Sequence, residues 1–192
     1  MTKIFETPTL ETERLVLRPH TLSDCESLQK YFNNWNIIKN LNGSVPWPYP
    51  TDGQKNHFAQ TIVPTTKDGS AYGWVICLKE APEHALGCIN YRYKNSRPEN
   101  GDRGFWLAEP HWGKGYMSEA VKAVNNFAFD ILKADKMVLT NRKSNIGSRR
   151  VKEKTGATYI KTILENWRDE KIEVEVWELT AEDWKKFRDK KL

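Results

Sequence analysis

Two glycines flank a lysine at positions 113–115, directly before a stretch with helical periodicity. Glycine allows a ligand to approach the backbone closely, and the first turn of a helix has N–H groups without helical partners. Together with the helix dipole, such a turn can hold an anion. The pattern matches neither a P-loop nor a Gly-x-Gly-x-x-Gly dinucleotide fingerprint. By itself it is equally compatible with a purely structural turn.

The turn lies between predicted strands and a predicted helix, which must hold it in place. Before the turn the sequence predicts an antiparallel meander of strands at 71–79, 85–94 and 102–108, with a loop at 95–101. After Gly115 it predicts a long amphipathic helix, whose buried face comprises Ala120, Val121, Val124, Phe127, Ala128 and Ile131. A strand at 136–141, a helix capped by Asn145 and ended by Gly156, a hairpin of 157–164 with 171–179, and a helix from Thr180 complete the chain.

The segment before the meander also contains residues that indicate where its elements begin and end. A first strand is expected at 13–18, followed by a helix whose apolar stripe is formed by Cys25, Leu28, Phe32 and Trp35. Three prolines make 42–50 a loop, and Thr51 with Gln54 predicts a capping box that opens a helix to about Ile62. No linker or repeat divides the chain, so we expect one α/β domain over residues 1–192.

Composition limits the function classes. The chain has 192 residues, 39% of them apolar, and a net charge of +5, which suits an anionic ligand without requiring nucleic acid. Three widely spaced cysteines and the lack of a His/Cys cluster predict reduced thiols and no metal. No signal-like start and no run of roughly 18 apolar residues is present, so we expect a cytoplasmic protein that does not use a membrane.

The sixteen-residue context of the turn is more specific than the turn itself. FWLAEPHWGKGYMSEA, from Phe105 to Ala120, closely resembles the pyrophosphate-binding segment of the GCN5-related N-acetyltransferases, most of all the branch that acetylates ribosomal-protein N-termini. Segments 11–18, 145–156 and the terminal hairpin resemble the same branch in the same order. The resemblance implies a mixed, mostly antiparallel twisted sheet of about seven strands flanked by helices, splayed between its fourth and fifth strands.

The resemblance further implies acetyl-CoA as co-substrate. The residues that would hold the cofactor are the turn amides of Gly113, Lys114, Gly115, Tyr116, Met117 and Ser118, the strand edge at Trp106, Leu107 and Ala108, and the side chain of Asn145. Met117 stands where the family has Gly or Ala, so its side chain must turn away from the phosphates. Asn145 can equally be a plain helix cap. The basic residues of 142–154 form either a solvated helix face or a site for the 3′-phosphate of coenzyme A.

Direct transfer to an amine, without an acyl-enzyme, is the chemistry that the resemblance implies. A base must take a proton from the amine, and Asp102 is the candidate at the start of the fourth strand, although it can instead cap a turn. Glu109 and His111 are rival bases. The family's Tyr acid is replaced by Lys152, so Ser148 is the substitute candidate, unless it only contributes a capping contact to Asn145.

Aromatic residues of the first helices and the proline-rich loop are candidates for the acceptor pocket, namely Trp35, Trp47 and Tyr49. The first hypothesis for the acceptor is a protein N-terminal amine. The alternatives are a small amine, such as an aminoglycoside, a polyamine or an amino acid, and a non-catalytic RNA- or ribosome-binding module. We do not expect a nucleic-acid partner, and the protein is expected to be a monomer or a homodimer.

Overall fold

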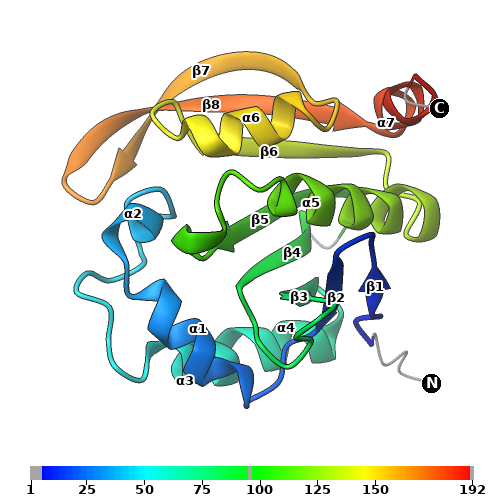
Figure 1. The fold of residues 1–192 in the computed structure, drawn as a ribbon. Helices are drawn as coiled ribbons and strands as arrows, with labels where there is room; N and C mark the ends of the chain where they lie inside the picture. Colours follow the sequence, from blue (N-terminus) through cyan, green and yellow to red (C-terminus); the bar gives the residue numbers. More distant parts are fainter. Residues whose placement is uncertain (1–5, 95–96, 191–192) are drawn as a thin grey trace.

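One mixed sheet organises the protein (Figure 1). The structure, a computed structural model, describes residues 6–94 and 97–190, without the side chains of 93–99. Within those ranges eight strands form a single sheet in the order β1-β2-β3-β4-β5-β6-β8-β7. They are β1 (Leu10–Glu11), β2 (Leu15–Pro19), β3 (Ala71–Leu78), β4 (Gly87–Lys94), β5 (Arg97–Leu107), β6 (Lys136–Arg142), β7 (Thr158–Trp167) and β8 (Glu170–Thr180). The predicted class is confirmed, and the two-residue β1 is the strand beyond the seven expected.

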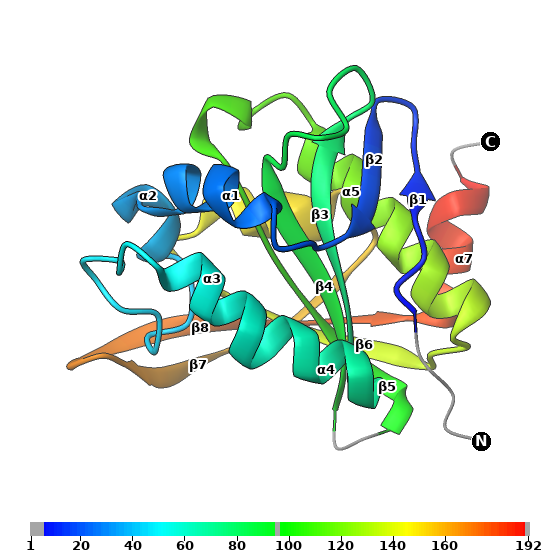
Figure 2. The same ribbon diagram turned by 90° about the horizontal axis from the view of Figure 1, so that it is seen from below.

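Helices cover both faces of this sheet. They are α1 (Asp24–Phe32), α2 (Trp35–Ile38), α3 (Gly53–His57), α4 (Val63–Asp68), α5 (Tyr116–Asn126), α6 (Ile146–Glu153) and α7 (Ala181–Asp189). Figures 1 and 2 show α1, α3 and α4 on one face of β2–β5 and α5 on the other, with α6 beside α5 and over β6 and β8. The start of α5 and the start of α6 therefore lie near each other on one side of the sheet.

The central strand β3 shows how the two layers of core are built. Trp74 and Ile76 belong to the large buried cluster that contains Val121 of α5. The intervening Val75 packs instead in the cluster with Leu28 of α1. Both faces of the strand are covered, which explains its nearly continuous apolar sequence.

The sheet opens between β5 and β6. All other neighbouring strands are antiparallel, whereas these two are parallel and pair only at Asn100 with Lys136 and Gly101 with Met137. From Asp102 to Leu107, β5 pairs with β4 alone, so its other edge is not part of a ladder. This is the expected splay, because β5 and β6 are the fourth and fifth strands that the sequence predicts.

Three predictions in the first half of the chain were wrong. Of the expected loop at 95–101, residues 97–101 are strand, because β5 already begins at Arg97, and residues 95–96 lie outside the described residues. The first helix ends at Phe32, and the side chain of Asn34 caps the separate helix α2, which leaves Trp35 40% exposed instead of on a buried stripe. The Thr51–Gln54 capping box does not form. Helix α3 starts at Gly53 without a side-chain cap and continues through a π turn at 58–62 into α4.

The second half of the chain follows the sequence predictions more closely, except at the end of α5. Helix α5 continues into a π turn over Phe127–Ile131. The wider turn brings Phe129 into the core and leaves Ile131 68% exposed, so the prediction of a buried Ile131 was wrong. Gly156 has the expected left-handed conformation, with φ at 83°, and the hairpin strand β7 extends to Trp167, beyond the predicted residue 164.

Candidate functional site

The turn before α5 has the conformation that its glycines permit. Gly113 and Gly115 have φ values of 76° and 83°, in the region that side chains rarely adopt. A Cβ on Gly113 would meet no atom within 4 Å, so the outer side of the turn is open. The 11-residue helix α5 starts directly after Gly115, so its first-turn N–H groups and the positive end of its dipole are at this open surface. The residues present therefore fit an anion such as a pyrophosphate.

A brace from the N-terminal segment holds this turn, and sequence analysis missed it. Arg14 Nε donates to Glu119 Oε2 at 2.8 Å, and Arg14 Nη1 donates to the carbonyl of Lys114 at 3.1 Å. The same guanidinium lies 4.7 Å above the ring centre of Tyr116. Thr12 Oγ1 also donates to Glu119 Oε1 at 2.6 Å. The only signal in the sequence was the resemblance of segment 11–18, which predicted a strand and no contact.

Met117 occupies the turn position where a small residue was expected. Its side chain is only 8% exposed and belongs to the main core cluster with Val121 and Leu107. The side chain therefore points into the protein, as the sequence analysis required of it. The backbone of the turn is left free of this bulk.

A large cleft of about 1980 Å³ extends from the turn to the β7–β8 hairpin. Among the predicted site residues, its lining includes Trp35, Tyr49, Asp102, Trp106, Leu107, Gly113, Gly115, Tyr116, Met117, Ser118, Asn145 and Ser148. Trp47, Ala108 and Lys114 lie outside it. The Ala108 N–H donates to the Leu86 carbonyl at 2.8 Å and the Leu107 carbonyl accepts from Trp112 Nε1 at 2.7 Å, so neither of these groups is available at the free edge of β5. The cleft thus brings together residues from β5, α5, α6 and the α2 region.

Aromatic residues form the wall of the cleft on the α1 side. The ring centres of Phe32 and Tyr49 are 4.7 Å apart, and those of Phe32 and Trp106 are 4.8 Å apart. Burial raises the pKa of Tyr49 to about 12, so its phenol is neutral at physiological pH and accepts a hydrogen bond from Gln54. Trp47 does not line the cleft, but its ring centre lies 5.2 Å from that of Trp35, which does.

The β7–β8 hairpin closes the far end of the cleft. Trp167 Nε1 donates to the Leu41 carbonyl at 2.8 Å, and Arg168 Nη2 donates to the Val45 carbonyl at 2.6 Å. The Arg168 guanidinium lies 5.7 Å from the ring of Trp35 and 4.9 Å from that of Trp167. These contacts join the hairpin to the proline-rich loop and its flank, which fixes the shape of this end of the cleft.

The three candidate bases have different surroundings. Asp102 lines the cleft, but its Oδ1 accepts from Arg92 Nε at 2.7 Å. Glu109 lies outside the lining and accepts from the side-chain amides of Asn34 and Asn36. His111 lines the cleft, and burial together with the charge of Lys114 lowers its pKa below the ordinary 6.5. The imidazole of His111 is therefore neutral near physiological pH.

Ser148 and Lys152 are paired one helical turn apart on α6. Lys152 Nζ donates to Ser148 Oγ at 2.8 Å, although the lysine is only 2% exposed. The Ser148 backbone N–H donates to Asn145 Oδ1 at 3.0 Å, so Asn145 is the helix cap, and the capping contact involves the Ser148 backbone and not its hydroxyl. Burial and, to a smaller extent, the charge of Arg103 lower the pKa of Lys152, whereas Glu175 raises it, and together these effects leave the pKa at about 7.

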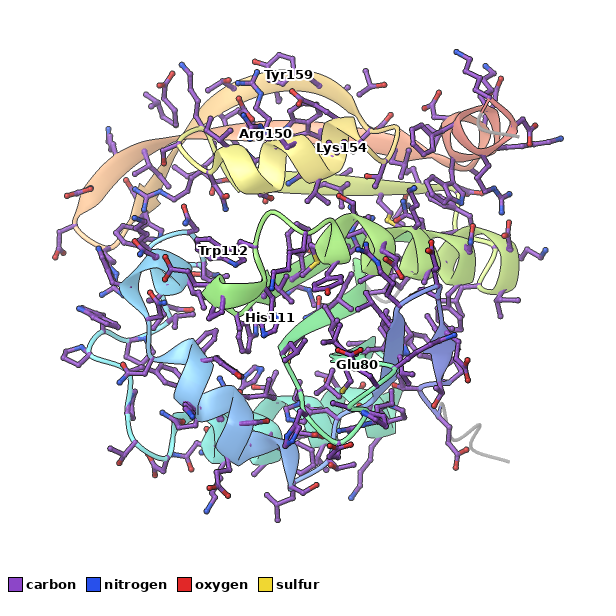
Figure 3. All side chains as sticks on the ribbon, in the orientation of Figure 1. Glu80, His111, Trp112, Arg150, Lys154 and Tyr159 are labelled. Carbon is purple, nitrogen blue, oxygen red and sulfur yellow. The ribbon has the colours of Figure 1, made fainter. Side chains whose placement is uncertain are left out.

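The basic run of 142–154 is mostly engaged by the protein itself. Four members are occupied: Arg142 lies over the Trp167 ring, Lys143 pairs with Glu173, Arg149 pairs with Glu153 and Glu175, and Lys152 is buried. Arg150 and Lys154 are exposed on α6 (Figure 3). Both line the cleft, and neither has an ion pair with any residue that the structure describes. Exposed side chains therefore coexist in this run with partners from the protein, and Arg150 and Lys154 are the exposed cations left without a described ion pair.

Over 6–94 and 97–190, no group of three or more His, Cys, Asp or Glu side chains is arranged to hold a metal ion. Nor does this part of the chain contain a helix that combines the length and the apolar character needed to cross a membrane.

The chain matches known acetyltransferases in sequence and in structure. Residues 14–158 match the family model of the acetyltransferase (GNAT) domain. The chain is 30% identical to the uncharacterized N-acetyltransferase p20 of Bacillus licheniformis over 129 residues, which cover 67% of this chain and 70% of p20. It is 43% identical to the probable N-acetyltransferase YjcK of Bacillus subtilis (strain 168) over 155 residues, which cover 77% and 82% of the two chains.

Two solved structures with the same fold carry different acceptor names. RimL, a ribosomal L7/L12 alpha-N-protein acetyltransferase in complex with coenzyme A, aligns with a TM-score of 0.75 at 18% identity over 90% of this chain and 98% of RimL. A spermidine N-acetyltransferase from Vibrio cholerae, in complex with coenzyme A and spermine, aligns with a TM-score of 0.73 at 17% identity over 88% and 97%. At these identities the likeness establishes the fold alone.

The open turn at the start of α5, the splayed sheet and the sequence match define one class of protein, an acyl-transferring enzyme. The chain belongs to the GNAT family and is an N-acetyltransferase.

Proposed function

We propose that this enzyme transfers the acetyl group of acetyl-CoA to the α-amine at the N-terminus of a protein. Gly113, Gly115 and the first turn of α5 are suited to the pyrophosphate, and the exposed Arg150 and Lys154 to the 3′-phosphate. The free β5 edge at Trp106 and Leu107 offers backbone groups to the pantetheine arm and a donor to the carbonyl oxygen. When bound, acetyl-CoA supplies the acetyl group as a reactive thioester.

The charge of the cleft lining is the observation that favours a peptide acceptor over a polyamine. Apart from Arg150 and Lys154, which are assigned to the 3′-phosphate, the lining contains the cations Lys39, Arg92, Arg103, Arg142 and Lys152, but only the carboxylates Asp102, Glu165 and Glu170. Asp102 is already paired with Arg92. A polycation such as spermidine would meet net repulsion there, whereas a single amine followed by acidic side chains would be attracted.

The acceptor amine must lose a proton before it attacks, and His111 fits this step best. It is neutral, lines the cleft and belongs to the segment between β5 and α5. Asp102 is the second candidate, because its ion pair with Arg92 competes for the carboxylate. Holding both reactants in one cleft supplies much of the acceleration without a covalent enzyme intermediate.

Coenzyme A release from acetyl-CoA over an acceptor panel tests this proposal. The panel contains Ser- and Ala-initiated peptides with either acidic or basic residues after the first position, spermidine, an aminoglycoside and free amino acids. We expect turnover with the acidic peptides, less with the basic peptides and none with spermidine. Turnover of spermidine without any peptide activity would overturn the peptide assignment. Steeply salt-dependent RNA binding without acetyl-CoA binding would instead favour the non-catalytic module.

A further inference from the structure

Lys152 is an unusual residue to find beneath a cleft. It is 2% exposed, yet it is part of the cleft lining, and its Nζ contacts the hydroxyl of Ser148, which also lines the cleft. Burial of an ammonium group is costly unless the group is paired or can give up its proton. A buried lysine whose amine is directed at a cleft hydroxyl therefore requires a physical reason.

Charged groups from two strands face this lysine. From β5 comes Arg103, which donates to Asn125 of α5 and whose Nε and Nη2 have no hydrogen-bond partner among the described residues. From β8 comes Glu175, which is 2% exposed and has its two oxygens engaged by Asn141 at 3.0 Å and Arg149 at 3.3 Å. Arg103 opposes a charged Lys152, and Glu175 supports it.

The balance of these effects leaves Lys152 with a pKa of about 7, whereas its ordinary value is 10.5. A lysine that only held the fold would be expected to pair directly with a carboxylate. Over the described part of the chain, no ion pair joins Lys152 to Glu175, whose oxygens accept from other groups. Lys152 can therefore exchange a proton near neutral pH, and the nearest group to receive it is the Ser148 hydroxyl.

We propose that Lys152 and Ser148 form a proton relay from α6 into the cleft, in which Ser148 protonates the sulfur that leaves during acetyl transfer and Lys152 reprotonates Ser148. This inference rests on the proposed function. A serine hydroxyl alone is too weak an acid for this task, but an ammonium at hydrogen-bond distance can replace its proton as it leaves. Lys152 acts through Ser148 and is thus a positioning and proton-supplying residue.

The protons balance over one turnover. The acceptor nitrogen bonds to the acetyl carbon while the carbon–sulfur bond breaks and its electron pair goes to sulfur. Ser148 gives its hydroxyl proton to that sulfur and takes one from the Lys152 ammonium. The acceptor ammonium loses two protons on becoming an amide. One of them restores Lys152 through solvent, and the other is released to the buffer.

Lysine NMR tests the relay without any need for turnover. In protein labelled with ¹³C at lysine Cε, we expect one signal that titrates near neutral pH and is absent from Lys152→Met. Lys161→Met, which removes an exposed lysine of β7, is the matched control and should retain that signal. The phosphates of both ligands can shift the midpoint, but it should differ between the complexes with coenzyme A and with desulfo-coenzyme A. Equal midpoints with the two ligands would overturn the relay even if the enzyme is active.

Kinetics on an accepted amine supply the second test. We expect kcat of the wild type to fall as pH rises through neutrality, because Lys152 must be protonated to act as an acid. Lys152→Met and Ser148→Ala should lower kcat by about a hundredfold while KM changes little. Lys152→Arg should not rescue kcat, because a guanidinium does not release its proton in this range.

Glu175→Gln provides the sharpest kinetic control, because its amide can still accept from Asn141. Loss of the negative charge should lower the pKa of Lys152 and move the falling limb of kcat to lower pH. An unmoved limb, or wild-type kcat in a folded Ser148→Ala, would overturn the relay. If no amine in the panel is acetylated, the proposed function fails, whereas the NMR comparison still decides whether Lys152 responds to the sulfur.

Discussion

Arg14 donates to Glu119 twice, from its backbone N–H to Oε1 and from Nε to Oε2, each at 2.8 Å. The two residues are 105 positions apart in the sequence, and their contact joins the approach to β2 with the first turn of α5. A carboxylate there also interacts favourably with the helix dipole. Because Arg14 additionally binds the Lys114 carbonyl, the pair fixes the backbone that forms the anion site.

Glu119→Gln should weaken acetyl-CoA binding while leaving the chemical step largely intact. The amide oxygen can still accept from Thr12 and from the Arg14 backbone N–H, but the amide nitrogen cannot accept from Arg14 Nε, so the turn loses the charged part of its brace. We expect a several-fold higher Kd by calorimetry and a nearly unchanged kcat. Glu182→Gln, which removes an exposed carboxylate from the pair with Lys186, is the matched control. Unchanged affinity for acetyl-CoA in Glu119→Gln would show that the turn keeps its conformation without the contact to Arg14.

The Glu119 carboxylate should make the free energy of unfolding depend on pH in acidic solution. Burial raises the pKa of Glu119, but the hydrogen bonds from Thr12 and Arg14 outweigh this and lower it below the ordinary 4.5. A lowered pKa gives stability that is present above the unfolded-state value and is lost as pH falls through the folded-state value. Glu119→Gln should therefore unfold at lower urea than wild type at about pH 7, and the gap should narrow towards about pH 3. A constant gap would contradict this linkage.

Gly115→Glu should abolish acetyl-CoA binding, because it places an anion at the start of α5. Gly115→Ala separates charge from backbone strain. Both variants carry a side chain at a φ of 83°, which costs about 1–2 kcal/mol, but only Glu repels phosphate. The added Cβ would lie 3.4 Å from Nη2 of Arg14 in both variants, so this contact does not distinguish them. We expect measurable calorimetric binding for Ala and none for Glu. Equal affinities of the Ala and Glu variants for acetyl-CoA would show that the pyrophosphate does not bind at this turn.

How far the sequence predicts such a site depends on the range of the interactions involved. The left-handed glycines and the Asn145 cap obey local rules, so their positions were predictable. The Arg14–Glu119 contact depends on how β2 packs beside α5, and no local pattern encodes it. The π turn that exposes Ile131 is likewise a tertiary effect, since the periodicity of the sequence favours an unbroken α-helix.

The fate of the basic run shows the same limit. Charge alone could not tell a solvated face from a phosphate site, because the answer depends on which partners the sheet brings near α6. Arg149 forms an ion pair with Glu175 of β8, and Arg142 lies over the ring of Trp167. Arg150 and Lys154 are the cations of the run that line the cleft, are exposed and have no described ion pair.

The double variant Arg150→Gln/Lys154→Gln should therefore raise the KM for acetyl-CoA by about tenfold. Wild type should discriminate against 3′-dephospho-acetyl-CoA, and the double variant should lose this preference because the cations that recognise the 3′-phosphate are gone. Lys143→Gln removes a neighbouring cation that pairs with Glu173 and should retain the preference. Equal discrimination by the double variant and wild type would mean that the 3′-phosphate binds elsewhere.

The choice between His111 and Asp102 as base can be decided from pH profiles. Burial and the charge of Lys114 lower the pKa of His111, so its neutral form persists below pH 6.5 and the rate should fall only in more acidic solution. Lys114→Gln removes one of these lowering effects, which should raise the His111 pKa and move the rising limb of kcat/KM to higher pH. His111→Gln should abolish that limb and most of the activity, whereas Asp102→Asn should leave the limb in place. Wild-type turnover by His111→Gln, together with inactivity of a folded Asp102→Asn, would assign the base to Asp102.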